Sequence, residues 1–371
     1  MPIWISAPAE LSAHLSTPLA RIGLDTEFVR ERTYWPQLAL VQIAIEDTIL
    51  LVDPLAPQMT TALAPLLGDP AVLKVMHSAS EDLVALKFAC GVVPTPLFDT
   101  QIGAALAGIG AGLGYQRLVQ DTLGIALQKG ETRSDWLRRP LSRSQLAYAA
   151  DDVRHLFALH DRIDARLNEL GRRDWLGEDC ARMVTNAQRD ELERWPHLSM
   201  RAAQFFDAPA QHRLLRLLRW RDLQARDSDR PRSWILDNDL ATTLARTPPP
   251  DRASLQTQLD AHPKAPRKLS DVLWRALNTP LVDEADAPAV RIDDRDKQAM
   301  RRLQEAVATR SAELGLPDGV LASRRWLESL LDSGEWPQAL AGWRRGELES
   351  SLGPLLAADG GDATASQDPI R

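Results

Sequence analysis

The sequence predicts an α/β N-terminal domain, a mixed sheet flanked by helices, followed by an all-α C-terminal half. Two observations predict this fold class: short β-rich runs alternate with helical patterns up to about residue 175, and β-rich runs are absent beyond about residue 207. A strand hairpin followed by alternating strands and helices is typical of such a sheet. The chain has 371 residues, the length of two or three domains at roughly 150 residues each.

Four short apolar runs in the first half predict strands, because aliphatic and β-branched residues alternate there with turn residues. A tight reversal is expected at Glu46 and Asp47, between the second and third of these strands. The expected strands are residues 22–28, 38–45, 48–52 and 72–76.

Two helices of the first half begin with the spacing of a capping box, a Ser followed three residues later by Glu or Gln. Ser78 and Glu81 have this spacing before a helix that should end at residue 91. Ser142 and Gln145 have it at the start of one long helix that we expect to continue to about Leu170.

Beyond the first domain, taken as residues 1–175, the folded parts of the chain are expected to be helical. We expect a helical connector at 176–207, helical domains at 208–285 and 286–356, and a disordered tail at 357–371 that is rich in Ala, Gly, Asp and Ser. The acidic, aperiodic stretch 281–296 has the pattern of a linker. Trp220 and Trp234 are expected in a helix-bundle core rather than as base-stacking platforms.

Composition excludes several classes of protein. Two cysteines, Cys90 and Cys180, exclude a disulfide scaffold and a multi-cysteine zinc site. The first residues lack the basic and apolar regions of a signal peptide. No uncharged apolar run approaches the roughly 20 residues that span a bilayer. We therefore expect a cytoplasmic protein with no membrane partner.

Two carboxylates lie two residues apart on the first expected strand, so Asp25 and Glu27 leave the same face. Their mutual repulsion would raise both pKa values unless a cation lies between them, and carboxylate oxygens suit Mg²⁺ or Mn²⁺. The alternative is a solvated turn of charges, since Arg30, Glu31 and Arg32 follow.

Further acidic candidates lie on the two expected helices. Asp82 lies in a first helical turn, where the helix dipole would also favour it for purely structural reasons. Tyr148 and Asp152 are four residues apart and share a helix face, with Asp151 close to it; a core hydroxyl with a partner is the alternative. Taken together, four carboxylates beside a phenol form the pattern of a two-metal phosphodiesterase site.

The segments that carry these residues resemble the three exonuclease motifs of the DEDD superfamily. They are Asp25-Thr-Glu27-Phe28, His77-Ser-Ala-Ser-Glu-Asp82-Leu and Tyr148-Ala-Ala-Asp-Asp152-Val. The four-residue step from tyrosine to aspartate is that of the tyrosine subclass, and it selects Asp152 over Asp151. Residues 128–142 are similar to the same region of the bacterial ribonuclease D family, and residues 217–239 and 316–327 resemble its helical HRDC domains.

The resemblance implies a ribonuclease H-like exonuclease fold and a 3′→5′ exoribonuclease that releases nucleoside 5′-monophosphates by a two-metal mechanism. Asp25 would bridge two divalent cations, Mg²⁺ or Mn²⁺. Glu27 and Asp152 would hold the cation that generates hydroxide, Asp82 would hold the other, and Tyr148 would orient the attacking water. The resemblance further implies RNA substrates, with 3′-extended tRNA precursors and other stable RNAs expected, and a monomeric protein.

Contacts to RNA are expected in two places. Residues 208–280 hold 13 Lys and Arg against 8 Asp and Glu, a net charge of +5 in a chain whose net charge is −7. This block is the best candidate for an RNA-tracking surface, and the alternative is a solvated basic face. Because all five candidate catalytic residues precede residue 153, we expect truncation after about residue 207 to spare the chemistry. The candidates nearer the site are Phe28, which could equally belong to the core, Lys129, Arg133, Arg138 and Arg139.

Two other functions are compatible with these motifs. One is a DNA-directed 3′→5′ exonuclease of the same superfamily, since the chemistry does not require a 2′-hydroxyl. The other is a catalytically silent RNA-binding protein. The intact carboxylate set argues against the second, because a scaffold has no need to bury side chains that repel one another.

Overall fold

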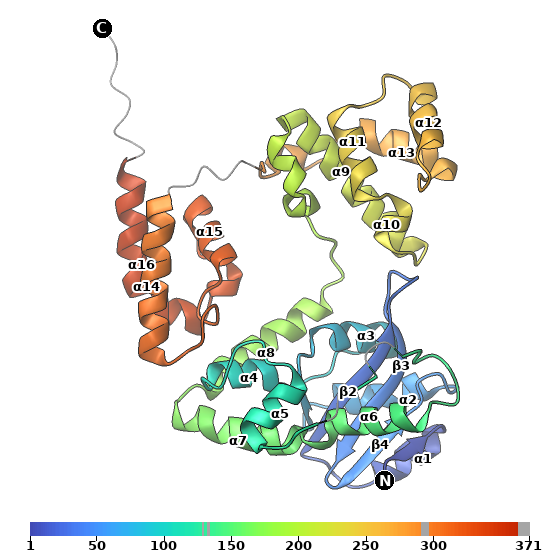
Figure 1. Cartoon of the computed structure of the whole chain (residues 1–371), viewed down its shortest axis with the longest axis vertical. Helices are drawn as coiled ribbons and strands as arrows, with labels where there is room; N and C mark the ends of the chain where they lie inside the picture. Colours follow the sequence, from blue (N-terminus) through green and yellow to red (C-terminus); the bar gives the residue numbers. More distant parts are fainter. Residues whose placement is uncertain (128–129, 132–133, 291–296, 363–371) are drawn as a thin grey trace. The chain divides into compact units, whose positions relative to one another are not determined.

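The structure, a computed structural model, describes residues 1–127, 130–131, 134–290 and 297–362. These residues form two compact units (Figure 1). Unit 1 comprises residues 1–29, 38–188 and the described residues after 296. Unit 2 comprises residues 30–37 and 189–290. A short segment of the first half of the chain therefore belongs to the same unit as the middle of the chain.

A six-stranded mixed sheet lies at the centre of unit 1, with strand order β1-β4-β3-β2-β5-β6. β1 is parallel to β4, β3 is antiparallel to β4, and β5 is parallel to both β2 and β6. The expected α/β fold class and all four expected strands are confirmed. β1 and β6 were not expected, because three residues are too few to show a pattern. The strands are β1 (Ile3–Ile5), β2 (Arg21–Val29), β3 (Gln37–Ile45), β4 (Thr48–Val52), β5 (Leu73–Met76) and β6 (Leu97–Asp99).

Helices cover both the faces and the edges of this sheet. α6 packs on β2 and β4 and lies across the strands in Figure 1, α7 contacts β5, and α8 contacts β6. Among the described helices, none is long and apolar enough to cross a bilayer. The helices of unit 1 are α1 (Pro8–His14), α2 (Met59–Gly68), α3 (Ser80–Cys90), α4 (Thr100–Leu106), α5 (Tyr115–Leu123), α6 (Arg143–Arg154), α7 (Leu156–Glu169), α8 (Arg173–Gln188), α14 (Lys297–Leu314), α15 (Arg324–Ser333) and α16 (Trp343–Asp362), with the 3-10 helix η5 (Gln338–Leu340).

One of the two expected capping boxes is present. At the start of α6, the Ser142 hydroxyl accepts from the Gln145 amide at 3.1 Å, and the Ser142 amide donates to the Gln145 side chain at 2.9 Å. The box expected at Ser78 is wrong, since Ser78 has a left-handed backbone with φ of 57° and does not cap α3. Instead the amide of Ala79 donates to the carboxylate of Asp99, on β6, at 2.8 Å.

The single long helix expected from Ser142 to Leu170 is also wrong. The helix is interrupted at His155, so that α6 ends at Arg154 and α7 begins at Leu156. The interruption has an identifiable cause, because the hydroxyl of Tyr115 is inserted there. It accepts from the His155 amide at 3.0 Å and donates to the Asp151 carbonyl at 3.1 Å. A side chain inserted into the helical hydrogen-bond ladder is a recognised cause of a kink or break.

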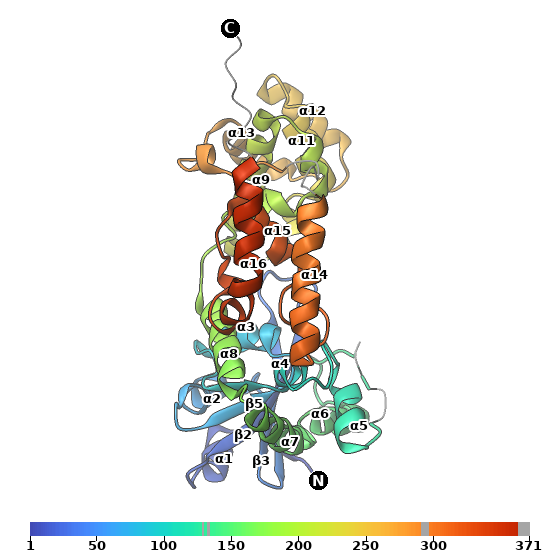
Figure 2. The same cartoon turned by 90° about the vertical axis from the view of Figure 1, so that its left-hand side faces the viewer.

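The last helical segment, residues 297–362, is part of unit 1 and shares its apolar core. Within it α14 and α16 lie side by side (Figure 2). The rings of Trp175 and Trp343 stack with centroids 4.3 Å apart. The buried Asp179 carboxylate accepts from two nitrogens of Arg344 at 2.6 and 2.8 Å. The sequence predicts that truncation after about residue 207 spares the chemistry. Such a truncation would also remove part of unit 1 and leave the buried Asp179 without Arg344.

Unit 2 is built around the long helix α9, which packs against α11 and α13 over a separate apolar core. Trp220 lies in that core, as expected, with 8% of its surface exposed. The same expectation is wrong for Trp234, which is 56% exposed. The helices are α9 (Ala208–Asp227), α10 (Arg232–Ile235), α11 (Asn238–Arg246), α12 (Arg252–Ala261) and α13 (Ser270–Asn278), with 3-10 helices η1 (Pro196–Ser199), η2 (Arg201–Phe205), η3 (Arg267–Leu269) and η4 (Glu284–Asp286).

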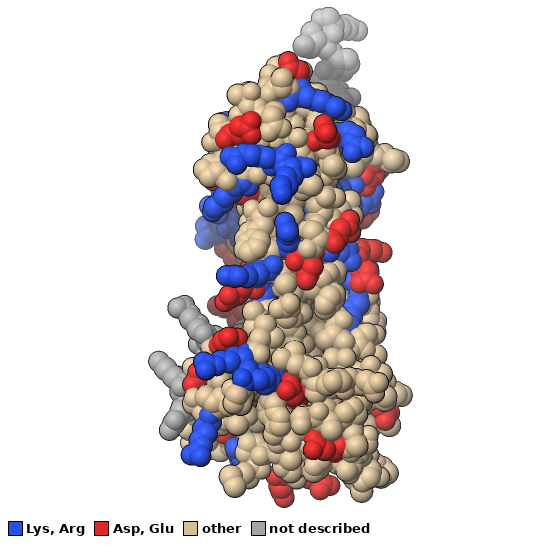
Figure 3. Space-filling view, turned by 90° about the vertical axis from the view of Figure 1, so that its right-hand side faces the viewer, with Lys and Arg blue, Asp and Glu red and all other residues tan. Residues whose placement is uncertain are grey.

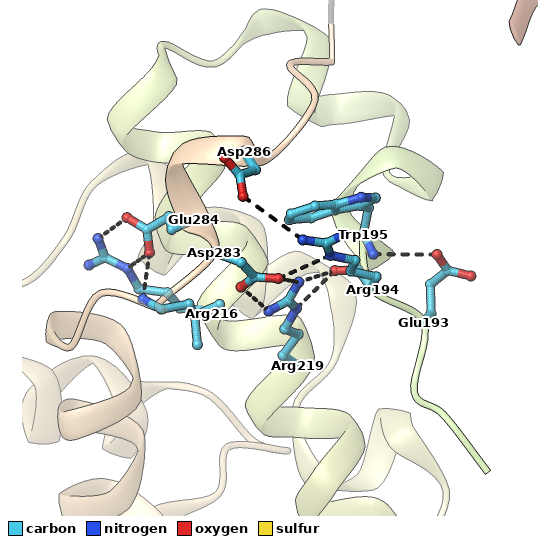
Figure 4. Close-up of polar contacts among 9 residues, drawn as sticks. Glu193, Arg194, Trp195, Arg216, Arg219, Asp283, Glu284 and Asp286 are labelled. Atoms are coloured by element: carbon cyan, nitrogen blue, oxygen red, sulfur yellow. Dashed lines mark hydrogen bonds and ion pairs between the residues drawn. The ribbon is translucent and has the colours of Figure 1, made fainter. Parts of the chain in front are cut away.

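The acidic stretch expected to be a linker is held against α9 over its described part, residues 281–290. Figure 4 shows Asp283 between Arg219 and Arg194, which donate to its carboxylate at 2.7 and 3.1 Å. Beside it, Glu284 is paired with Arg216 at 2.5 Å. These ion pairs explain why an aperiodic acidic sequence is ordered here, and residues 291–296 lie outside the described residues.

Candidate functional site

Strand β2 carries the first two carboxylates of the candidate site. Its residues Ile22 and Leu24 are completely buried, and this fixes the strand in the middle of the sheet just before Asp25 and Glu27. Both carboxylate residues are partly buried. The position of the pair is therefore determined by the most buried part of the fold rather than by a surface loop.

Helix α3 brings the third carboxylate to β2. Asp82 lies in the first turn of α3, which contacts β2, and only 8% of its surface is exposed. The hydroxyl of Thr26, between Asp25 and Glu27 on β2, donates a hydrogen bond to the Asp82 carboxylate. This bond links the first and second motifs directly. The role of Thr26 was missed from the sequence, although its place between the two acidic residues was visible.

Helix α6 supplies the phenol and the fourth carboxylate. The hydroxyl of Tyr148 hydrogen-bonds the Asp152 carboxylate one helical turn later, and both residues are partly buried. Asp151 is turned away and pairs with Arg154 at 2.8 Å. Asp152, and not Asp151, is among the charges that act on Asp25 and Glu27, so the structure groups these two residues with the aspartate that the resemblance selected.

The pKa values of all four carboxylates are raised, and burial is the largest cause for each. For Asp25 the largest cause is burial, followed by repulsion from Asp82, Asp152 and Glu27, and together they raise its pKa well above the usual range. Burial and repulsion from Asp152 and Asp82 raise the pKa of Glu27 to about 8. Burial raises the pKa values of Asp82 and Asp152 to about 7, although hydrogen bonds from Thr26 and Tyr148 oppose the rise. Ionisation of the cluster is therefore unfavourable in the folded protein, and a cation bound among the carboxylates would lower its free-energy cost.

The donor set fits a hard divalent cation. Four carboxylates supply only oxygen ligands, which Mg²⁺ and Mn²⁺ prefer, and a cation among them would offset the repulsion. In the part of the chain that the structure describes, no three His, Cys, Asp or Glu side chains are already arranged to hold a metal ion. Cation binding would therefore draw these carboxylates closer together.

A cavity of about 340 Å³ lies beside Tyr148 and Asp152 and is lined also by Gly130 and Ser144. A Cβ atom at Gly130 would lie 1.7 Å from the Tyr148 ring, well inside van der Waals contact. Because Gly130 has no side chain, the backbone can pass directly against the ring of Tyr148, which lies beside Asp152 in the cavity. The sequence reasoning missed this residue, and its only signal was a glycine inside the family-like segment 128–142.

The structure separates the candidate RNA contacts. Phe28 is half-buried and packs against the core of unit 1, whereas Arg138 is exposed. Arg139 donates to both carboxylate oxygens of Asp53, at 2.7 and 2.9 Å, and to the Ala39 carbonyl at 2.6 Å, so its guanidinium holds the 134–142 segment to the sheet. The two remaining candidates, Lys129 and Arg133, lie outside the described residues.

Comparisons with known proteins agree with this geometry. Residues 2–168 match a 3′-5′ exonuclease family. A ribonuclease D from Xanthomonas oryzae pv. oryzae is 62% identical over 96% of this chain and 99% of its own length. A ribonuclease D from Pseudomonas paraeruginosa is 38% identical over 89% of this chain and 90% of its own. The crystal structure of Escherichia coli RNase D, described as an exoribonuclease involved in structured RNA processing, superimposes with a TM-score of 0.84 at 28% identity, covering 96% of this chain and 99% of that one.

The electrostatic stress predicts a pH-dependent stability in the absence of metal. Asp82, Asp152 and Glu27 have folded-state pKa values of about 7, 7 and 8, against ordinary values of 3.8, 3.8 and 4.5. Between these limits the folded state binds more protons than the unfolded state. The contribution of the cluster to stability is therefore fully present below about pH 4 and is lost as pH rises to about 8.

We expect the melting temperature of the metal-free protein to fall between pH 5 and pH 8, and to fall less in Asp25→Asn, which removes one of the repelling charges. Calorimetry on both proteins measures this difference. Saturating Mg²⁺ should recover most of the loss at pH 8, because the cation binds the ionised carboxylates. Identical pH slopes for the two proteins would contradict the proposed repulsion.

The contact between Gly130 and Tyr148 predicts a selective loss of activity. Gly130→Ala should displace the Tyr148 ring and lower kcat on the order of tenfold or more, since a misplacement of about 1 Å near a reacting centre can cost 10²-fold. Gly177→Ala is the matched control, because a Cβ there meets nothing within 4 Å. Steady-state kinetics and thermal melts check the pair, and normal kcat in a folded Gly130→Ala protein would refute the prediction.

Proposed function

Because this chain belongs to the ribonuclease D family of 3′→5′ exoribonucleases, we propose that it hydrolyses RNA from the 3′ end at Asp25, Glu27, Asp82 and Asp152 by a two-metal mechanism. The observation that carries the proposal is the convergence of four carboxylates whose pKa values are all raised by burial, with repulsion from the other carboxylates adding to the rise for Asp25 and Glu27. Such a set is unfavourable for a binding scaffold and suits a pair of divalent cations.

Each residue has a role in this proposal that its position supports. Asp25, the carboxylate that all three others repel, would bridge the two cations. Glu27 and Asp152 would hold one cation and Asp82 the other. When bound, the cations supply a hydroxide nucleophile at neutral pH and offset the charge that develops on the leaving 3′-oxygen. Tyr148, which hydrogen-bonds Asp152, would orient the attacking water, and the product would be a nucleoside 5′-monophosphate.

The physiological substrates we propose are the 3′ extensions of tRNA precursors and other stable RNAs. Support comes from the similar Escherichia coli enzyme, which is described as acting in structured RNA processing. The cytoplasmic location and the monomeric state expected from the sequence belong to the same proposal. DNA-directed hydrolysis is the competing outcome, because none of the four carboxylates requires a 2′-hydroxyl.

Unit 2 is the part of the chain that we propose contacts longer RNA. Figure 3 shows Lys and Arg side chains spread over the surface of this unit, in the upper part of the view, with Asp and Glu among them. A cavity of about 540 Å³ within the unit is lined by Arg30, Arg221 and Arg232. Trp234, two residues after Arg232, is 56% exposed. Surfaces that bind single-stranded nucleic acid combine cationic groups with exposed aromatic rings, and unit 2 carries both.

The catalytic assignment predicts a ranking of three variants. Asp25→Asn and Asp152→Asn should each lower kcat by a factor on the order of 10³, since several kcal/mol of transition-state stabilisation depend on each carboxylate. Asp151→Asn should cost less than about tenfold, because Asp151 pairs with Arg154 outside the cluster.

The assay is single-turnover cleavage of a 3′-extended tRNA, and of DNA of the same sequence, with Mg²⁺ and sizing of the products. Release of mononucleotides from RNA alone is the expected result. Equal rates on the two substrates would favour the DNA-directed alternative. A greater loss in Asp151→Asn than in Asp152→Asn would show that the wrong aspartate has been assigned.

The proposed RNA surface predicts that Trp234→Ala weakens binding of single-stranded RNA about 5-fold to 150-fold, which corresponds to about 1–3 kcal/mol for one stacked base. Leu223→Ala is the control, because Leu223 is another exposed apolar residue of unit 2 but has no aromatic ring. Fluorescence anisotropy measures both dissociation constants. Cleavage of a dinucleotide should be unchanged in both variants. Equal RNA affinity of the two variants would show that Trp234 is not part of the RNA-binding surface.

A further inference from the structure

The break between α6 and α7 lies three residues after Asp152, at a place where the sequence pattern favours one continuous helix. In such a helix the His155 amide would donate to the Asp151 carbonyl, four residues earlier. In the structure these two groups are instead joined through the hydroxyl of Tyr115, at 3.0 and 3.1 Å. The phenol thus replaces one backbone hydrogen bond by two, and both backbone groups remain satisfied.

Tyr115 is itself held in place by a residue of the turn that follows β5. It is the first residue of α5, and its ring packs edge-on against the ring of His77, with centroids 5.7 Å apart. His77 lies directly after β5, and its Nδ1 is 2.9 Å from the hydroxyl of Thr100. The Thr100 hydroxyl donates in turn to the Met76 carbonyl at 3.0 Å. A chain of contacts therefore runs from the end of β5 through His77 and Tyr115 to the backbone of Asp151.

The hydroxyl of Tyr115 is close enough to the site to interact electrostatically with its carboxylates. Burial raises the pKa of Tyr115, and the negative charges of Asp152 and Asp25 raise it further, while its hydrogen bond from His155 opposes the rise. The phenol consequently keeps its proton at neutral pH. It needs that proton to donate to the Asp151 carbonyl, so the bridge is stable over the pH range in which the enzyme would work.

We propose that Tyr115 is a positioning residue, which holds the last turn of α6 so that Asp152 and Tyr148 face the carboxylates of β2. The inference rests on the proposed function, because it assigns to Tyr115 the placement of a cation ligand. Tyr115 touches no reacting atom in this account. It acts through the backbone at Asp151 and His155. Without its hydroxyl, the His155 amide can donate directly to the Asp151 carbonyl, and the resulting continuous helix would turn Asp152 away from Asp25.

The test is Tyr115→Phe, which keeps the ring against His77 and removes only the bridging oxygen. Loss of a group that orients a metal ligand typically costs 10–100-fold in metal affinity or activity. We therefore expect the dissociation constant for Mg²⁺, measured by calorimetric titration without RNA, to rise about tenfold or more. kcat should fall by a similar factor, while KM for a short RNA should stay within about twofold.

The matched control is Tyr34→Phe, which removes a phenolic oxygen that accepts from Arg232 at 3.0 Å within unit 2. This variant should bind Mg²⁺ and cleave the short RNA as the wild type does. If Tyr115 only stabilised the fold, Tyr115→Phe would melt at a lower temperature with unchanged Mg²⁺ affinity and kcat, and that result would overturn the inference.

A second measurement uses the wild-type protein and so does not depend on the folding of a variant. Mg²⁺ should slow hydrogen exchange of the His155 amide, because cation binding fixes Asp152 and with it the bridged turn. Unchanged exchange would count against the inference. A wild-type protein that neither binds Mg²⁺ nor cleaves RNA would overturn the proposed function and this inference together, whereas normal Mg²⁺ affinity in Tyr115→Phe beside an active wild type would overturn this inference alone.

Discussion

Mutual repulsion among four partly buried carboxylates is the constraint to which the fold of unit 1 is adapted. Asp25, Glu27, Asp82 and Asp152 would separate if they lay on mobile segments, because each ionised group raises the energy of the others. They lie instead on a central strand and on two helices packed against the sheet. Apolar burial of these elements keeps the charges together, and protonation or a bound cation relieves the stress.

The two helices that carry Asp82 and Asp152 are held at their ends by polar contacts. Asp99 accepts from the backbone at the start of α3, and Thr26 donates to Asp82 from β2. Ser142 caps α6 at its start, and Tyr115 bridges the chain where α6 ends. Because buried polar groups cost free energy when they are unpaired, such contacts fix the orientation of an element as well as its stability. The site is therefore supported not only by Thr26 of the first motif but also by Asp99, Ser142 and Tyr115, which lie outside the three motifs.

The helical half of the chain is divided between two different environments. Residues 297–362 share the apolar core of unit 1, where Arg344 neutralises the buried Asp179. Residues 189–290 form a core of their own, joined by residues 30–37, in which the amides of Tyr34 and Trp35 both donate to Asp229 at 3.0 Å. The strand that carries Asp25 and Glu27 thus leads directly into unit 2. The proposed RNA surface is therefore tested by substitutions in unit 2 rather than by truncation, which would also remove part of unit 1.

The preference for Asp152 over Asp151 came from the resemblance to the exonuclease motifs. The sequence by itself determined the α/β class, the four longer strands and the cap at Ser142. These features depend on alternation, helix periodicity and spacings of a few residues, which act locally along the chain. Only the tertiary structure decided the break at His155, the pairing of Arg139 with Asp53, the exposure of Trp234 and the packing of 297–362 on unit 1. Each of these depends on partners far away in the sequence. The hydroxyl that interrupts the helix at His155, for example, belongs to Tyr115, which lies 40 residues earlier in the chain. The local periodicity of residues 142–170 does not depend on so distant a residue and therefore cannot predict the break.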